Sequence, residues 1–223
     1  MFKSLIYKEW LKTGKAIAAA AVLLLCFTAY DFLALAKNAE IRGFSFLWAF
    51  AAQKDSVLVD NMKYLPLLCG LLVAAAQYVP EAARKRLKLT LHLPYPQGRT
   101  ICVMQGYGIA ALLALFLLQT VALALFLRHY LVAELTGRII FSFLTWYCAG
   151  LCAYIWAGAI CLEPSWRMKI VLTVVAAAVL SIFFISPTAM AYRHSILSLF
   201  IFPTLCAAIL IHYSVSRFKD GVQ

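Results

Sequence analysis

Six apolar runs, each close to the length of a membrane-crossing helix, divide this sequence of 223 residues. A helix that crosses the hydrocarbon core of a bilayer needs about 20 mostly apolar residues. The runs cover residues 16–36, 64–79, 101–127, 139–162, 170–187 and 195–213. The segments between them are too short for a separate soluble domain of ~100 residues. The sequence therefore predicts an all-α polytopic membrane protein, with six transmembrane helices in a single transmembrane domain over residues 1–223.

The composition agrees with this prediction and excludes other classes of protein. Hydrophobic residues make up 65% of the chain and charged residues 13%, and the mean hydropathy is +0.88. Soluble domains have roughly 45–50% apolar and about 25% charged residues, so a soluble globular domain is excluded, as is a disordered chain. The seven cysteines lie in or beside apolar runs without a CxxC pair. They predict neither a disulfide framework nor a metal site.

The distribution of basic residues predicts the orientation. The chain has 20 Lys and Arg residues against 9 Asp and Glu, a formal net charge of +11. These residues fall between the apolar runs, which favours the basic bias of cytoplasmic loops over nucleic-acid binding. Thirteen of the 20 lie on the side that carries both termini, and seven lie on the other side. We therefore expect both termini to be cytoplasmic, with the lipid bilayer and no nucleic acid as a partner.

Residues 1–15 predict an interfacial amphipathic helix in front of the first span. Apolar residues recur there at helical spacing, with lysines between them. The apolar set is Phe2, Leu5, Ile6 and Trp10, the lysines are Lys3, Lys8, Lys12 and Lys15, and Glu9 follows Lys8. We expect the apolar face to lie at the acyl boundary and the lysines to face anionic headgroups.

The segment between the second and third spans, residues 81–99, is the most charged part of the chain and yet contains four leucines. A loop exposed only to water would not be expected to contain four leucines, Leu87, Leu89, Leu91 and Leu93. We therefore expect these leucines to contact a partner or the underside of the bundle. The four alternate as in a strand, but they also form i,i+4 pairs as in a helix, and the pattern alone does not decide. We also expect Glu81 to form an ion pair with the N-terminal lysines.

This segment resembles the cytoplasmic loop between the second and third spans of type-2 ABC transporter permeases. The shared features are an acidic residue that closes the second span (Glu81), a basic stretch, a leucine-rich stretch that ends in Leu93-Pro94, and Arg99 at the start of the third span. Lys85-Arg86 stands where the family often has Gly-Thr. The N-terminal amphipathic helix with Lys8-Glu9, and the six spans with both ends inside, also match the family.

The resemblance implies a permease subunit in the cytoplasmic (inner) membrane of a bacterium, driven by a separate cytoplasmic ABC ATPase subunit. ATP and Mg²⁺ would bind to that partner, and this chain itself would bind no cofactor. Residues 81–93 would form the coupling helix that docks in a cleft of the ATPase, and a second permease copy or a similar permease would complete a dimer. The residues expected to make the docking contact are Glu81, Arg84, Arg86, Leu87, Lys88, Leu89, Leu91, Leu93 and Pro94.

The sequence contains no GxxxxGK[ST] phosphate loop, no HExxH and no GxSxG motif, so we expect no ATP site and no hydrolase centre of these kinds in this chain. Polar residues inside the spans are candidate pathway residues, namely Asp31, Gln77, Gln105 and Gln119. An ion-driven transporter needs buried carboxylates or broken helices for its coupling ion, and the spans offer one peripheral carboxylate. We therefore expect an external energy source and a lipid-like or amphipathic substrate.

Two alternatives stay open at this point. The chain is a non-transporting scaffold or assembly subunit of an ATPase-driven complex, or it is an intramembrane lipid-modifying enzyme. The enzyme would use the one polar cluster at the outer face, Arg128, His129 and Glu134. Small residues inside the spans, such as Ala149-Gly150, favour close helix packing within the chain over packing at a dimer seam.

Overall fold

The computed structural model describes residues 2–43, 60–83, 97–186 and 191–220. All regular secondary structure in these ranges is helical, which confirms the predicted all-α class. The elements are α1 (Phe2–Arg42), η1 (Asp60–Met62), α3 (Leu65–Ala83), α5 (Gln97–Tyr130), α6 (Ala133–Leu162), α7 (Trp166–Ile182) and α8 (Ile196–Asp220).

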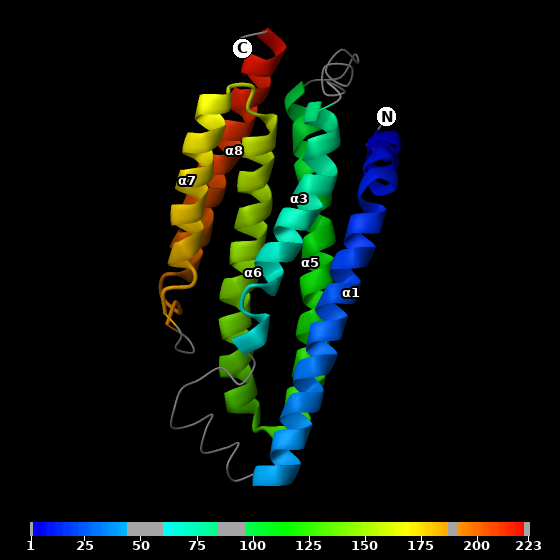
Figure 1. Cartoon of the computed structure of the whole chain (residues 1–223), viewed down its shortest axis with the longest axis vertical. Coiled ribbons are helices and arrows are strands. Elements are labelled where there is room, and N and C mark those ends of the chain that lie inside the picture. Colours follow the sequence, from blue (N-terminus) through cyan, green and yellow to red (C-terminus); the bar gives the residue numbers. More distant parts are fainter. Residues whose placement is uncertain (1, 44–59, 84–96, 187–190, 221–223) are drawn as a thin grey trace.

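The helices run side by side in an elongated bundle (Figure 1). α6 lies in the middle and packs against α3, α5, α7 and α8, while α1 packs against α3 and α5. The first and last helices place both ends of the chain at the same end of the bundle, where α3 ends and where α5 and α7 begin (Figure 1). We call this the basic end, because it carries Arg99, Arg167, Lys169 and Arg217.

Five helices, α1, α3, α5, α6 and α8, are long and apolar enough to cross a membrane. Large apolar side chains cover their outer faces, for example Leu33, Leu125 and Phe202, which are 72%, 71% and 73% exposed. An apolar exterior of this kind suits lipid rather than water as the surrounding medium. α7 has 17 residues, which gives a length of about 26 Å, somewhat less than the ~30 Å hydrocarbon core. A sixth crossing by α7 stays a prediction.

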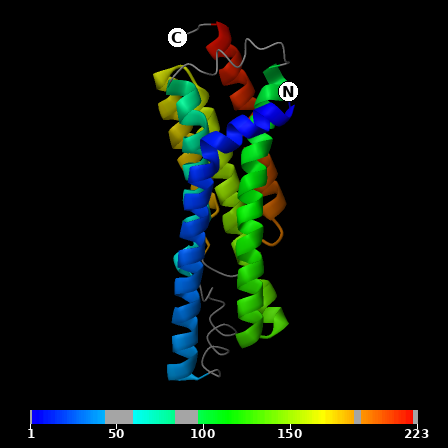
Figure 2. The same cartoon turned by 90° about the vertical axis from the view of Figure 1, so that its right-hand side faces the viewer.

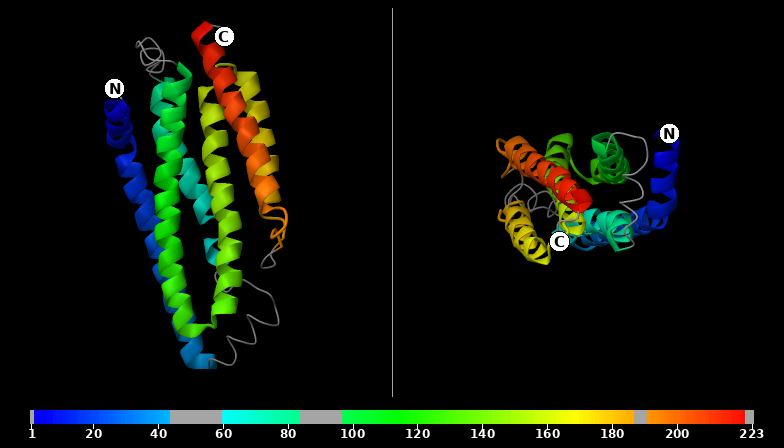
Figure 3. Two further views of the ribbon diagram at one scale, coloured as in Figure 1. Left: turned by 180° about the vertical axis from the view of Figure 1, so that it is seen from behind. Right: turned by 90° about the horizontal axis from the view of Figure 1, so that it is seen from above.

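The predicted interfacial helix is helical, but it is continuous with the first span in the single 41-residue helix α1. Its first turns lie across the direction of the remaining helix (Figure 2), and the view from above shows them extending sideways (Figure 3). The hydroxyl of Thr13 donates to the carbonyl oxygen of Glu9 at 2.8 Å, and such bonding back to the preceding turn bends helices. Gly14 follows directly and adds flexibility to this part of α1.

α1 also extends further at its other end than the apolar run predicts. It ends at Arg42 rather than near Ala36, because Gly43 is the first residue that breaks the helix. Gly43 has a φ of 80° and its N–H donates to the carbonyl oxygen of Ala39 at 3.0 Å, the arrangement in which glycine commonly closes a helix. Asp31 consequently lies eleven residues from the end of α1.

Glycine allows α3 and α6 to meet backbone to backbone. A Cβ at Gly70 would overlap the carbonyl oxygen of Gly150, and a Cβ at Gly150 would lie 2.5 Å from the carbonyl oxygen of Pro66. Ala149 and Ala153 beside this contact are fully buried. The prediction that Ala149-Gly150 packs within the chain is therefore confirmed.

Candidate functional site

A cluster of buried polar side chains joins four helices, α1, α3, α5 and α6, near the basic end. Gln77 of α3 lies at its centre and is fully buried. Its Nε2 donates to Oε2 of Glu9 at 2.9 Å and to the carbonyl oxygen of Met104 at 2.8 Å. Its Oε1 accepts a hydrogen bond of 2.6 Å from the hydroxyl of Tyr154. Both amide hydrogens have acceptors and the amide oxygen has a donor, so this buried group is fully satisfied.

Two carboxylates and two lysines form the charged part of this site, which we call the ion-pair cluster: Lys8, Glu9, Lys12 and Glu81. Lys12 Nζ lies 3.0 Å from Oε1 of Glu9 and 3.1 Å from Oε1 of Glu81. Lys8 Nζ lies 3.0 Å from the same oxygen of Glu81. The expected ion pair between Glu81 and the N-terminal lysines is confirmed.

The buried carboxylates of the cluster require a counter-charge. Glu9 and Glu81 are each 1% exposed, and an unpaired carboxylate in such a place costs several kcal/mol. In their ionised forms the two carboxylates and two ammonium groups add up to no net charge. Pairing the charges within a cluster of no net charge offsets the free-energy cost of burying them beside an apolar bundle. The cluster therefore holds the start of α1 against the last turn of α3.

Lys12 differs from the expected headgroup-facing position, because its side chain is 13% exposed and its ammonium group is shared by Glu9 and Glu81. Lys8 pairs with Glu81 while its side chain stays 39% exposed, so contact of Lys8 with lipid headgroups stays a prediction. Lys3 is exposed, in agreement with the prediction.

The outward stripe of the same helical segment is aromatic and apolar. Tyr7, Trp10 and Leu11 are 63%, 56% and 65% exposed and lie at positions i, i+3 and i+4 of one face. Tyrosine and tryptophan are enriched where a membrane meets water, so this stripe suits the interfacial position predicted for Trp10. Phe2 begins α1, and its side chain lies outside the described residues.

Two tyrosines extend the hydrogen-bond chain into α6. The hydroxyls of Tyr78 and Tyr154 are 3.0 Å apart, and since Tyr154 donates its proton to Gln77, Tyr78 donates to Tyr154. A Cβ at Gly108 would overlap the Tyr154 hydroxyl, and a Cβ at Gly158 would lie 2.8 Å from the Tyr78 ring. The two glycines therefore provide the space that the tyrosines fill.

A smaller polar cluster ties α6 to α8 at the same end. Glu163 is 2% exposed, and its Oε1 accepts a hydrogen bond of 3.0 Å from Nη1 of Arg217. The hydroxyl of Ser214 donates to the other oxygen of Glu163 at 2.5 Å. Together with the ion-pair cluster, this contact fastens helices from both halves of the chain near the basic end.

The four candidate pathway residues do not all lie in one place. Gln77 is enclosed in the basic-end cluster. Asp31 accepts a hydrogen bond of 3.2 Å from Nδ2 of Asn61 beside η1, and one oxygen of its carboxylate is buried without a partner in the part of the chain described here. Gln119 lies 3.4 Å from the hydroxyl of Thr28, and Nε2 of Gln105 is buried and unpaired within the described ranges. Nε2 of Gln119 also lies 3.3 Å from the sulfur of Met62, the residue after Asn61 in η1. Asp31 and Gln119 are therefore brought together around η1, whereas Gln77 lies near the basic end.

Eight of the nine expected docking residues lie outside the described residues, namely Arg84, Arg86, Leu87, Lys88, Leu89, Leu91, Leu93 and Pro94. Glu81 is described, and it lies three residues before that segment, fixed in the ion-pair cluster. That residues 81–93 form a coupling helix stays a prediction.

The three residues of the enzyme alternative lie on both sides of the junction between α5 and α6. Arg128 and His129 end α5, and Glu134 begins α6. Glu134 is 79% exposed at its side chain and pairs with Arg138 one turn along its own helix, at 3.5 Å. Within the described ranges no group of three or more His, Cys, Asp or Glu side chains is placed to hold a metal ion.

Sequence reasoning did not single out Tyr78, Tyr154 and Tyr107. The signal available was chemical: a tyrosine inside an apolar span has a hydroxyl that must find a hydrogen-bond partner when it is buried. The Tyr107 hydroxyl lies 3.2 Å from that of Thr13, which brings α5 into the same network. Each of these partners comes from another helix, so sequence spacing could not pair them.

Comparison with family models, with curated proteins and with solved structures gives no match for this chain. The geometry alone therefore defines what the site can do. Displacement of Glu81 at the end of α3 would pull on Lys8 and Lys12 of α1 through the ion pairs, and on α6 through Gln77 and Tyr154.

Proposed function

We propose that this chain is the membrane-spanning permease subunit of an ABC transporter, driven by ATP hydrolysis in a separate ATPase at the basic end. The observation that carries the proposal is the position of Glu81. It lies immediately before the leucine-rich basic segment that resembles a coupling helix, and it is held by two ion pairs to the crosswise start of α1. A force applied to residues 84–96 would thus reach α1 directly.

The mechanical path continues into the centre of the bundle. Gln77 lies one turn before Glu81 on α3 and bonds to both Glu9 and Tyr154. α6, which carries Tyr154, packs against four other helices. Closure of an ATPase dimer would therefore move α1, α3 and α6 as a connected unit, instead of bending α3 alone.

The remaining parts of the proposal concern the membrane. α7 serves as the sixth crossing, since the apolar residues Phe183–Ile185 follow it and the next helix returns to the basic end (Figure 1). The basic end faces the cytoplasm of a bacterium, in agreement with the distribution of Lys and Arg. A second permease copy completes the pathway, and the weakly charged helices suit a lipid-like or amphipathic substrate.

The test is purification of the tagged chain from its native membrane in mild detergent, followed by mass spectrometry and an ATPase assay of the eluate. The proposal predicts a stoichiometric ATPase subunit. The double variant Arg84→Glu/Leu91→Glu should abolish co-elution of the ATPase subunit. Arg128→Glu reverses a charge at the opposite end of α5 and should leave this co-elution intact.

Two outcomes would contradict the proposal. One is a chain that repeatedly elutes without any ATPase. The other is an ATPase that remains bound in the Arg84→Glu/Leu91→Glu variant, which would show that this segment does not dock the ATPase. A bound ATPase whose reconstituted complex moves no lipid or amphipathic probe would favour the assembly-subunit alternative.

A further inference from the structure

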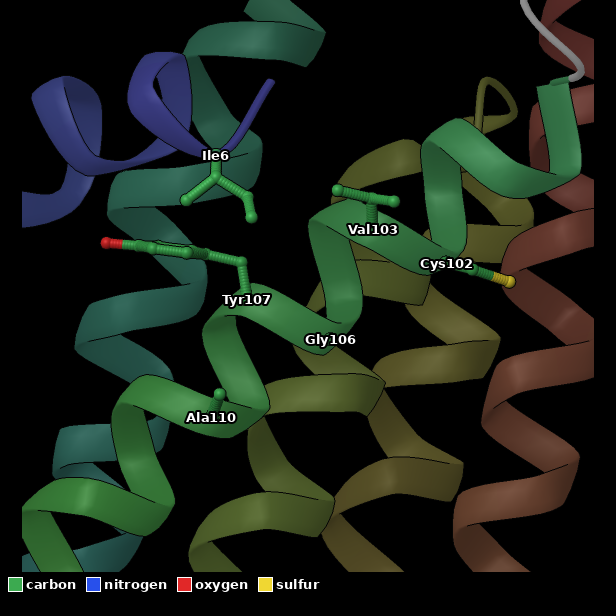
Figure 4. A pocket seen from close by; sticks show the side chains of 6 residues that line it. All are labelled: Ile6, Cys102, Val103, Gly106, Tyr107 and Ala110. Carbon is green, nitrogen blue, oxygen red and sulfur yellow. The ribbon is translucent and has the colours of Figure 1, made fainter. Parts of the chain in front are cut away.

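A groove opens between the crosswise start of α1 and the first turns of α5. Its volume is about 430 Å³, and it is lined by Ile6, Cys102, Val103, Gly106, Tyr107 and Ala110. Figure 4 shows Ile6 pointing from α1 toward Tyr107, and the other lining residues along one stretch of α5. This volume falls within the ~300–1,000 Å³ typical of ligand sites.

The lining is almost wholly apolar, and its length matches one leaflet of a bilayer. The residues of α5 that line the groove run from Cys102 to Ala110, which corresponds to about 12 Å along a helix. One leaflet contributes about half of the ~30 Å hydrocarbon core. A groove of this depth suits an acyl chain that enters from the surrounding leaflet.

Two basic residues lie one helical turn before lining residues of the groove. Lys3 precedes Ile6 by one turn on α1, and Arg99 precedes Val103 by one turn on α5, so each shares a helix face with a lining residue. Both side chains are exposed. An apolar slot with cations at the headgroup level complements an anionic phospholipid, because basic sites at a membrane surface attract lipid phosphates.

Gly106 keeps the middle of the groove open. A Cβ built at this position meets no atom within 4 Å. The groove also adjoins the polar site described above, because the Tyr107 ring lines it while the Tyr107 hydroxyl lies 3.2 Å from Thr13. An acyl chain in the groove would contact both α1, through Ile6, and α5, next to the Thr13–Tyr107 contact.

We propose that this groove binds one acyl chain of an anionic phospholipid, whose phosphate is held by Lys3 and Arg99. The site is independent of the transported substrate and of any ATPase partner. It places a lipid where the first turns of α1 cross α5, and so makes the position of α1 sensitive to the composition of the leaflet.

The test is a lipid titration of the purified chain in detergent, followed by native mass spectrometry. Palmitoyl-oleoyl phosphatidylglycerol should bind about tenfold or more tightly than the phosphatidylcholine with the same chains. Lys3→Glu/Arg99→Glu should remove this preference, and Lys37→Glu, at the far end of α1, should keep it. Gly106→Leu should weaken the binding of both lipids about tenfold or more by filling the groove.

Gly137→Leu is the matched control for Gly106→Leu, because a Cβ at Gly137 in α6 also meets nothing within 4 Å. Equal affinity for the two lipids, a preference that survives Lys3→Glu/Arg99→Glu, or unchanged binding in Gly106→Leu would each overturn the assignment. Inorganic phosphate should not displace phosphatidylglycerol at millimolar concentration. Displacement would mean that the basic residues bind phosphate without the groove, and would also overturn it.

Discussion

Replacement of Lys12 by Met tests the energetic role of the ion-pair cluster. The Lys12 ammonium group contacts both Glu9 and Glu81, and its side chain is 13% exposed while theirs are 2% and 1% exposed. Breaking a buried ion pair by removing one partner costs 3–5 kcal/mol. Glu81 keeps Lys8 and Glu9 keeps Gln77 in the variant, so we expect a smaller loss of unfolding free energy, about 2–3 kcal/mol.

A double-mutant cycle isolates the interaction itself. Lys12→Met, Glu81→Gln and the combined variant are compared by equilibrium unfolding in mild detergent, and the coupling energy should be about 1–3 kcal/mol. The control cycle uses Glu134→Gln and Arg138→Met, an i,i+4 pair with side chains 79% and 43% exposed. Exposed helix pairs of this kind contribute ~0.3–0.5 kcal/mol. A coupling energy for Lys12 and Glu81 no larger than the control value would refute the reasoning.

Two further predictions concern packing and hydrogen bonding inside the bundle. Gly70→Ala should lower the unfolding free energy by about 1–3 kcal/mol, because the added Cβ overlaps the Gly150 backbone. Gly137→Ala is the control and should cause no loss, because the space around Gly137 is open. Equal effects of the two substitutions in thermal unfolding would contradict the backbone contact between Gly70 and Gly150. Tyr154→Phe removes the donor to Gln77 and the acceptor for Tyr78 and should cost about 1–3 kcal/mol. Tyr30→Phe, at a 60% exposed site, should be neutral in the same assay, and a neutral Tyr154→Phe would show that the hydroxyl chain adds no stability.

The positions of the helices could be predicted from the sequence, but several of their ends could not. Apolar length locates a span because the bilayer fixes how many apolar residues are needed. It says nothing about polar turns that continue a helix into water, so α1 extends from Ala36 to Arg42, where Gly43 stops it. α7 shows the opposite case, since its apolar run continues to Pro187 while the helix ends at Ile182.

The sequence predicts the contacts of the site that follow from complementary charge. It does not predict the contacts that depend on which face of a helix points inward. Glu81 and the N-terminal lysines are complementary and lie at the same end by span counting, so their pairing followed from the sequence. The inward position of Glu9 did not, because it depends on Gln77 and on the crosswise direction of the first turns of α1. Lys12 therefore has two carboxylate partners, of which only Glu81 could be predicted from the sequence.

Hydrogen–deuterium exchange of the first turns of α1 tests the central claim, that force on the docking segment reaches α1 through the ion-pair cluster. The measurement uses the complex with its co-purified ATPase, without nucleotide and after trapping with ATP and vanadate. Trapping should change the exchange of residues 5–13 in the wild-type chain. In Lys12→Met/Glu81→Gln, with the ATPase still bound, that change should be lost. An equal change in both proteins, or no change in the wild type, would contradict the claim.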